Sequence, residues 1–379
     1  MKISVIICEY NPMHAGHVYQ IEKTRELTGC DKVIAVMSGS FTQRGEPAVY
    51  DKFKRTKAAL LNGIDMIVEL PSLFSSATAE KFAYGGVFTA NSLGVCDYLS
   101  FGAENAELSA LYKIASFLTN EPAEYKEALK AGLKNKLSYP SARRDALLSY
   151  FPGYEELISS PNNILAIEYL KALIRLKSDI SPIAIERKGS SYHERVLNDV
   201  PSATAIREAL KRNEDISGFS KVPPGGEVFS ESLFLPLIIK LRASSPEELK
   251  NIEGISEGLE FSVIKAARTA KSYEELIELI KSKRYARTRV SRILLNILLD
   301  IKKSSPAAPE YIRVLGIKKD SKELLSLMAK NASLPVITSP AAFNNEELKR
   351  DIFAADLRAA LEKPAGEAFK DFSTPLITI

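Results

Sequence analysis

The chain has 379 residues, 45% of them hydrophobic and 26% charged, which is the composition of a folded globular protein and excludes a long disordered chain. Its 51 Lys and Arg against 47 Asp and Glu give a net charge of +4, which does not by itself indicate a nucleic-acid binder but is compatible with a local basic patch. The apolar runs are too short to span a bilayer, the first residues do not resemble a secretory signal, and the three cysteines form no CxxC pair, so we expect a reduced cytoplasmic protein with neither membrane contact nor a cysteine zinc site.

Five short runs of β-branched and apolar residues predict strands in the first two hundred residues, and stretches with helical apolar spacing separate them. The strands are expected at residues 3–7, 32–37, 66–70, 98–101 and 183–186, and the helices include residues 18–27, 53–62 and 204–212. This alternation predicts an α/β fold with a Rossmann-like parallel sheet that is covered by helices on both faces. Such sheets bind ligands at the carboxyl ends of their strands.

The sequence PPGG at residues 223–226 interrupts this pattern, and neither a helix nor a central strand tolerates it. We therefore predict two domains, residues 1–222 and residues 227–379. The second is expected to be mostly α-helical, with helices at residues 231–242, 246–251, 257–270, 273–280, 290–301, 322–330 and 346–361. Only residues 314–316 and 334–337 in this half are typical of short extended segments.

The motif HxGH, formed by His14, Gly16 and His17, follows the first predicted strand at the start of the next helix. A helix N-terminus presents free N–H groups that attract phosphate, and Gly16 lets the backbone approach a nucleotide closely. The two imidazoles are then placed to donate to phosphoryl oxygens as charge develops, which makes His14 and His17 the candidate catalytic residues. The alternative is two ordinary loop histidines that cap a turn.

Other segments favour a nucleotide site at the same edge of the sheet. Arg187 and Lys188 follow the last predicted strand, while Ser202 is placed to cap a helix that carries Arg207 one turn later. Alone, Ser202 indicates only a capped helix, but with HxGH it completes the second half of a triphosphate clamp. The sequences GxGxxG, GxxxxGK[ST], GxSxG and HExxH are absent, so the common alternative nucleotide and hydrolase motifs are not supported.

Three loops near the predicted strand ends are rich in residues typical of turns and ligand contacts. Residues 38–47 have the composition of a binding loop. Gly102 either accommodates an adenine or ribose against the backbone or simply ends a strand, and Asn162 either contacts a ligand or caps a helix.

A basic segment, residues 281–292, holds six Lys and Arg and no acidic residue. If it is helical, Tyr285, Arg289, Arg292 and Asn296 share a face opposite the apolar stripe that starts at Val290. Such a face is suited to RNA phosphates, with Tyr285 exposed to stack on an unpaired base. The alternative is a basic face that is merely solvated.

Taken together, these motifs resemble those of the tRNA(Met) cytidine acetate ligase family, within the HxGH nucleotidyltransferase-like superfamily. The resemblance extends over nearly the whole chain. Its anchors are EYNPMHAGH at residues 9–17, VMSG at 36–39, QRGEPA at 43–48, FGAE at 101–104, PNNIL at 161–165, SYH at 191–193, SATAIR at 202–207 and KRY at 283–285.

The resemblance implies a ligase that acts in two steps. ATP and acetate give acetyl-adenylate and pyrophosphate, and the acetyl group then passes to N4 of the wobble cytidine of elongator tRNA(Met), which leaves N4-acetylcytidine and AMP. Residues 1–222 are expected to bind ATP and residues 227–379 to bind tRNA. Mg²⁺ is expected to accompany ATP, although no carboxylate cluster indicates a dedicated protein metal site.

Site residues follow from the motifs and from the resemblance. The expected ATP contacts are Ile7, Cys8, Glu9, Tyr10, Asn11, Pro12, Met13, His14, Ala15, Gly16, His17, Val18, Tyr19, Gln20, Gly102, Asn162, Arg187, Lys188, Ser202 and Arg207. The expected tRNA contacts are Lys283, Arg284, Tyr285, Arg287, Arg289 and Arg292.

Two other functions agree with the same residues. One is an adenylyltransferase that joins AMP to a phosphorylated small molecule, and the other is a non-catalytic protein that binds ATP and RNA. The long helical half with its basic segment argues against the first. No residue stands out as the base that accepts the proton of the cytidine amine, and the sequence specifies neither the acetate pocket nor the oligomeric state.

Overall fold

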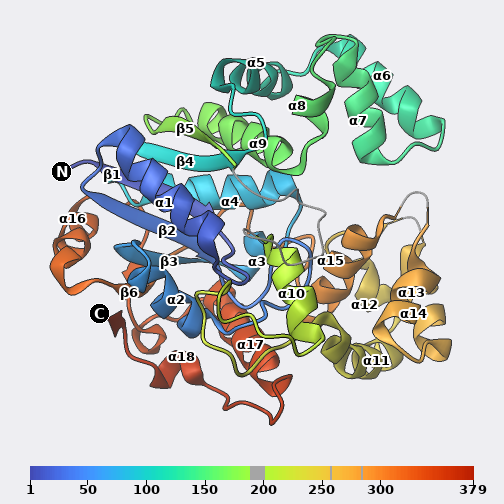
Figure 1. The fold of residues 1–379 in the computed structure, drawn as a ribbon. Helices are drawn as coiled ribbons and strands as arrows, with labels where there is room; N and C mark the ends of the chain where they lie inside the picture. Colours follow the sequence, from blue (N-terminus) through green and yellow to red (C-terminus); the bar gives the residue numbers. More distant parts are fainter. Residues whose placement is uncertain (188–200, 257, 283–284) are drawn as a thin grey trace.

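The structure of the protein is a computed structural model that describes residues 1–187, 201–256, 258–282 and 285–379. Figure 1 shows a central sheet between layers of helices, with further helices beyond its β5 edge and another group below and to the right. In the described part of the chain, no helix is both long enough and apolar enough to cross a membrane.

All five predicted strands form, and they are parallel to one another. They are β1 (Ile3–Cys8), β2 (Lys32–Ser38), β3 (Met66–Leu70), β4 (Tyr98–Ala103) and β5 (Ser181–Glu186). Their order in the sheet is β5-β4-β1-β2-β3. Strand order therefore reverses between β1 and β4, and this switch point is where α/β sheets of this kind bind ligands.

Helices cover both faces of the sheet, which confirms the predicted α/β fold class. One face carries α1 (Ala15–Thr28) and α2 (Lys52–Leu61), and the other carries α4 (Ala79–Ser92) and α9 (Pro161–Leu176). Along β1 the side chains alternate: Ile6 packs with Ile21 of α1, while Val5 and Ile7 belong to the apolar cluster of α4 and α9. The strand is thus buried on both faces, as its continuous apolar sequence predicts.

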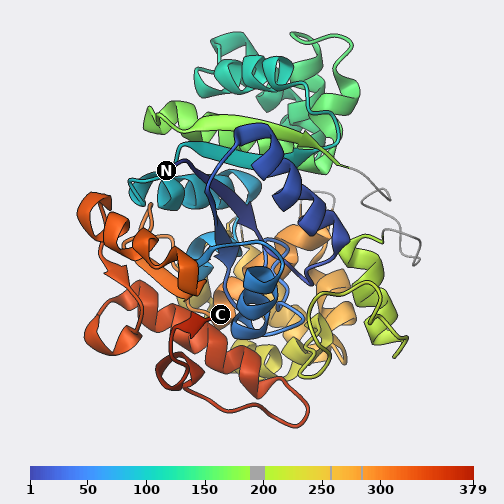
Figure 2. The same ribbon diagram turned by 60° about the vertical axis from the view of Figure 1, so that its left-hand side comes forward.

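The remaining helices of this half lie mostly between β4 and β5 in the sequence. They are α3 (Ser72–Ser75), α5 (Leu108–Thr119), α6 (Ala123–Lys134), α7 (Tyr139–Leu148), α8 (Glu155–Ser159) and, after β5, α10 (Ala203–Lys211). In Figure 2 the helices α5 to α8, coloured teal to green, extend from the β5 edge of the sheet, opposite the C-terminal helices in orange and red.

A helical body follows the PPGG segment. It consists of the 3-10 helix η1 (Ser230–Leu233), α11 (Phe234–Ala243), α12 (Pro246–Lys250), α13 (Leu259–Thr269), α14 (Tyr273–Ile280) and α15 (Arg287–Leu298). The predicted apolar stripe of α15 is buried: Val290, Ile293, Leu294 and Ile297 are each at most 2% exposed. In the described residues, this apolar interior is continuous with the cluster beneath α4 and α9.

The prediction of one helical domain over residues 227–379 is wrong for its last part, because residues 312–379 return to the sheet. Strand β6 (Ile312–Ile317) pairs antiparallel with β3, and β7 (Val336–Ile337) and β8 (Ile377–Thr378) pair with β6. The connecting and covering elements are η2 (Lys319–Ser321), α16 (Glu323–Asn331), η3 (Pro340–Ala342), α17 (Glu346–Ala360) and α18 (Lys370–Ser373). Strand β6 is fully buried, so the pairing also covers an edge that β3 alone would expose.

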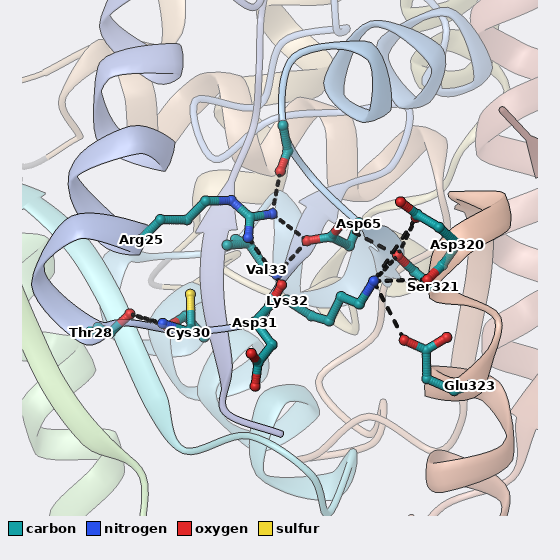
Figure 3. Close-up of polar contacts among 12 residues, drawn as sticks. Arg25, Thr28, Cys30, Asp31, Lys32, Val33, Asp65, Asp320, Ser321 and Glu323 are labelled. Atoms are coloured by element: carbon teal, nitrogen blue, oxygen red, sulfur yellow. Dashed lines mark hydrogen bonds and ion pairs between the residues drawn. The ribbon is translucent and has the colours of Figure 1, made fainter.

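Polar contacts fasten the returning segment to the N-terminal half. Figure 3 shows Lys32 of β2 between the Asp320 carbonyl, the Ser321 hydroxyl and the Glu323 carboxylate, with Nζ–O distances of 2.8, 2.9 and 3.4 Å. In the same view Arg25 of α1 donates to Asp65, which precedes β3.

A buried ionic cluster lies deeper in the same interface. The ammonium of Lys52 on α2 is 2.7 Å from both Glu69 of β3 and Asp371 of α18, and Arg313 of β6 pairs with the same two carboxylates. Each of these four side chains is at most 3% exposed. Although burial opposes ionisation, Lys52 and Arg313 hold the pKa of Asp371 below its ordinary value.

Candidate active site

An open cleft lies at the carboxyl ends of β1, β4 and β5, beside the switch point of the sheet. Two adjoining cavities, of about 1100 and 480 Å³, share six residues of their walls and so form one continuous space. The shared residues are His14, His17, Gln20, Gly102, Arg187 and Ser202.

His14 is the N-cap residue of α1 and His17 lies in the first turn of that helix, and together they cap it. The Nδ1 atom of His14 accepts the Gly16 N–H at 3.1 Å, and Nδ1 of His17 accepts the His14 N–H at 3.2 Å. This reciprocal pair is a capping box made of imidazoles. The capping role that sequence reasoning weighed as an alternative is therefore present, and the same two residues also line the cleft.

Both imidazoles are neutral near pH 7. Burial, followed by the charges of Arg187 and Arg207, lowers the pKa of His14 to about 4. Burial, His14 and Arg187 lower the pKa of His17 well below its ordinary value. Because each Nδ1 accepts an N–H, each neutral ring carries its proton on Nε2 and offers that N–H as a donor.

The turn is packed so tightly that Gly16 is required in it. A Cβ at Gly16 would lie 2.9 Å from Cε1 of His14. The rings of His14 and His17 have centroids 4.0 Å apart, and buried Tyr10 contacts His17 edge-on at 5.0 Å. The imidazole positions are therefore fixed before any ligand binds.

Arg187 and Asn162 approach the cleft from β5 and α9. Arg187 follows β5, and its Cγ is 3.3 Å from the position that a Cβ on Gly102 would take, so the glycine gives this side chain room to cross β4. Asn162 donates through Nδ2 to the Glu104 carboxylate at 2.6 Å, and its backbone N–H donates to the same group at 3.1 Å. Asn162 thus has the structural role of bonding α9 to the end of β4, and it also lines the cleft.

Helix α10 contributes a third group. Ser202 caps it, with Oγ accepting the Ala205 N–H at 3.2 Å, which is the role predicted for this serine. Arg207, one turn later, donates to the Asn11 carbonyl at 2.8 Å. This bond joins α10 to the HxGH turn, so the two halves of the predicted clamp lie together in the structure.

Most residues expected to contact ATP line the cleft. They are Ile7, Cys8, Glu9, Tyr10, Asn11, His14, Gly16, His17, Tyr19, Gln20, Gly102, Asn162, Arg187, Ser202 and Arg207. Pro12, Met13, Ala15 and Val18 line neither cavity. Met13 is fully buried and Val18 packs against the same apolar cluster, because a turn between a strand and a helix directs part of its side chains into the core. Lys188 lies outside the described residues.

Sequence reasoning did not identify an apolar wall of the cleft. Phe82 of α4, Phe101 of β4, and Leu165 and Tyr169 of α9 form it, and the rings of Phe101 and Tyr169 have centroids 5.8 Å apart. No signal in a single sequence separates these residues from ordinary core positions, because apolar residues in helices and strands serve both purposes.

The loop at residues 38–47, predicted to bind ligand, lines the cleft through Thr42, Gln43, Arg44 and Glu46. Its Gly45 has a φ of +74°, and a Cβ there would lie 2.5 Å from the backbone nitrogen of Arg292 on α15. The Arg292 guanidinium also donates to the Gln43 carbonyl at 3.4 Å. The basic end of the helical body therefore borders the cleft directly.

The predicted exposed face of the basic segment is largely packed, and the stacking role expected of Tyr285 is wrong. Tyr285 is only 8% exposed and donates to the Ser256 carbonyl at 3.1 Å. Helix α15 begins at Arg287, so Tyr285 precedes the helix and does not follow its periodicity. Asn296, also assigned to that face, is buried and bonded to the Glu253 carbonyl.

The arginines of the segment differ from one another. Arg287 pairs with Glu274 of α14, and Arg289 lies over the buried Tyr285 ring at 4.3 Å from its centroid. Arg289 and Arg292 are partly exposed. Arg292 lies next to the 38–47 loop, and Arg289 lies about one turn before it on α15. Lys283 and Arg284 lie outside the described residues.

Comparison with known proteins agrees with the fold and with the motifs. A family model described as HIGH Nucleotidyl Transferase matches residues 1–370. Proteins named tRNA(Met) cytidine acetate ligase are similar over their full or nearly full length: that of Thermoanaerobacter sp. is 41% identical with 100% of both chains covered, and that of Acetivibrio thermocellus is 39% identical with 94% of both covered.

Two crystal structures of Thermotoga maritima TmcAL are similar over the whole of both chains at 32% sequence identity. The structure bound with alpha-thio ATP has a TM-score of 0.89, and the apo structure has a TM-score of 0.91. The resemblance inferred from the sequence motifs is thus confirmed. The chain belongs to the HIGH nucleotidyl transferase family and, within it, to the family of tRNA(Met) cytidine acetate ligases.

Proposed function

We propose that this protein uses ATP to activate acetate as acetyl-adenylate and then acetylates N4 of the wobble cytidine of elongator tRNA(Met). One observation carries the proposal: two neutral imidazoles, His14 and His17, cap α1 and line a cleft that also contains Arg187 and Arg207. Known relatives at about 40% identity carry the name of this activity, which supports it.

In the first step, the triphosphate of ATP lies against the start of α1. The helix dipole and the Nε2–H groups of the two histidines stabilise the negative charge that develops, while Arg187 and Arg207 attract the phosphates. An acetate oxygen attacks the α-phosphorus, and pyrophosphate leaves. The reaction needs alignment and charge stabilisation but no protein nucleophile. Cys8 is not one, because burial raises the pKa of its thiol well above its ordinary value.

The product of that step, a mixed anhydride, hydrolyses readily and needs protection from water. The apolar wall of Phe82, Phe101, Leu165 and Tyr169 gives the cleft a dry side on which it can lie. In the second step, the tRNA brings its cytidine to the anhydride from the side where Arg289 and Arg292 border the 38–47 loop. Their charges are suited to holding phosphates without reading sequence.

Mg²⁺ belongs to the proposal as a companion of ATP. Within the described residues, no group of three or more His, Cys, Asp or Glu side chains is arranged to hold a metal ion. We therefore assign the ion to the triphosphate itself, where it would neutralise charge on the leaving pyrophosphate. A substrate of this kind also agrees with action in the cytoplasm.

One assay tests the function. The protein is incubated with ATP, Mg²⁺, labelled acetate and total tRNA, and the tRNA is digested to nucleosides. We expect label in N4-acetylcytidine of elongator tRNA(Met). ATP–pyrophosphate exchange without acetate, and without label in RNA, would instead identify a small-molecule adenylyltransferase. Retention of RNA with no ATP turnover would identify a binding protein.

A further inference from the structure

Glu9 occupies an unusual place for an acidic residue. It follows β1 directly, lines the cleft and is half-buried. Its Oε1 accepts the Gln43 N–H at 2.8 Å, and no other described residue makes a hydrogen bond to the carboxylate. The second oxygen, Oε2, is therefore left for a ligand.

The backbone of Glu9 is held as firmly as its side chain. The guanidinium of Arg55, which is fully buried on α2, donates to the Glu9 carbonyl at 2.7 Å and to the Ser38 carbonyl at 2.9 Å. Two strand ends, those of β1 and β2, are thereby fixed around the carboxylate. A group positioned in this way is pre-organised for a specific partner.

A carboxylate at this position does not serve to hold phosphate. His14, His17 and Arg187 offer N–H donors to a triphosphate, whereas an ionised Glu9 repels it. The chemistry of a carboxylate is complementary to an amine, and Glu is a standard hydrogen-bond acceptor for the N4 amine of cytosine. The amine that the proposed reaction acylates is this same group.

We propose that Glu9 accepts a hydrogen bond from the N4 amine of the target cytosine and takes a proton from it as the acetyl group is transferred. This inference rests on the proposed function. The bond between N4 and the acetyl carbon forms, the bond between that carbon and the phosphate oxygen breaks, and AMP leaves with the electron pair. The proton displaced from N4 passes to the Glu9 carboxylate, so charge and atoms balance.

The electrostatic surroundings agree with a proton acceptor. Burial raises the pKa of Glu9, while the Gln43 N–H, Arg207 and Arg44 act in the opposite direction. A raised pKa makes the carboxylate a stronger base. The other titratable groups that face Glu9 are Glu46 of the 38–47 loop, Arg55 of α2, Tyr169 of α9 and Cys8 of β1.

Hydrogen bonds also connect Glu9 to the basic helix α15. Arg292 of α15 donates to the carbonyl of Gln43, the residue whose N–H holds Glu9. Gln43 therefore connects the Arg292 guanidinium, which is suited to RNA phosphates, to the Glu9 carboxylate. Glu46, another acidic residue of the cleft, also faces Arg287 and Tyr273 of the helical body.

The experiment compares the two half-reactions in Glu9→Gln. Acetate-dependent ATP–pyrophosphate exchange measures the first, and single-turnover transfer from separately prepared acetyl-adenylate to tRNA(Met) measures the second. We expect transfer to fall on the order of 100-fold or more, with a far smaller loss of exchange. The loss should appear in the rate constant at saturating tRNA and much less in the half-saturating tRNA concentration.

Two further variants complete the test. Glu9→Asp keeps a carboxylate and should recover part of the transfer rate, and Glu22→Gln, an exposed glutamate on α1, is the matched control for loss of one charge. Transfer by Glu9→Gln at the wild-type rate, or an equal loss of both half-reactions, overturns the role of Glu9. Wild-type protein that makes no N4-acetylcytidine from acetyl-adenylate overturns the proposed function as well, so the two failures are distinguishable.

Discussion

His14 uses its two ring nitrogens differently: Nδ1 accepts the Gly16 N–H, and Nε2–H is left as a donor. His14→Ala removes both functions, whereas His14→Asn keeps an acceptor for the cap and loses the Nε2 donor. We expect both variants to lose on the order of 100-fold in acetate-dependent pyrophosphate exchange. Only His14→Ala should also lose about 1 kcal/mol of unfolding free energy, measured in urea. Wild-type exchange in His14→Asn would show that the imidazole is not the donor.

The same residue makes stability depend on pH. The pKa of His14 is 6.5 in an unfolded chain and about 4 in the folded protein, so below pH 6.5 the unfolded state binds more protons. The contribution of neutral His14 to the free energy of unfolding is complete above pH 6.5. It is lost as the pH falls toward 4, by up to about 3 kcal/mol. Urea unfolding at about pH 7 and about pH 5 should show a larger loss for wild type than for His14→Asn. Equal losses would contradict the assigned pKa.

At the scale of elements, the contact between the 38–47 loop and α15 depends on Gly45. Gly45→Ala places a Cβ against the helix backbone at a φ of +74°, so we expect α15 and the loop to separate, with a loss of about 2–3 kcal/mol. Gly153→Ala is the matched control, because Gly153 has a φ of +87° and nothing within 4 Å of its Cβ position. It should lose about 1 kcal/mol from the backbone alone. Equal urea midpoints for the two variants would contradict the close packing.

Elements with a local signal could be predicted from the sequence, and those without one could not. The HxGH turn, the Ser202 cap and the buried stripe of α15 have recognisable spacing. The start of α15 has none, because its N-cap is Ala286, whose side chain makes no capping bond. Tyr285 would share a face with Arg289 only if the helix extended back to it, and it lies before the helix. The apolar wall was missed for a similar reason, since Phe82 and Tyr169 have the spacing of core residues.

At the scale of the molecule, the unpredicted feature is the return of the chain to the sheet. Strand β6 pairs with β3, and Glu69 lies opposite Arg313 across some 240 positions of sequence. A short apolar run such as residues 312–317 carries no information about its partner, because pairing over this distance is decided by burial of both faces. The PPGG segment lies just before the first helix of the helical body, but nothing local marks the end of that body.

The buried cluster of Lys52, Glu69, Arg313 and Asp371 gives this return its most specific test. Lys52→Met leaves the two carboxylates facing Arg313 alone in a dry interior, so we expect a loss of about 3–5 kcal/mol in unfolding free energy and faster proteolysis after residue 312. Lys349→Met removes an exposed ion pair on α17 and should change the urea midpoint little. If both variants unfold at the same urea concentration, the cluster does not hold the C-terminal segment on the sheet. If Lys52→Met alone is destabilised and is cleaved within residues 318–379, the buried cluster is what holds that segment on the sheet.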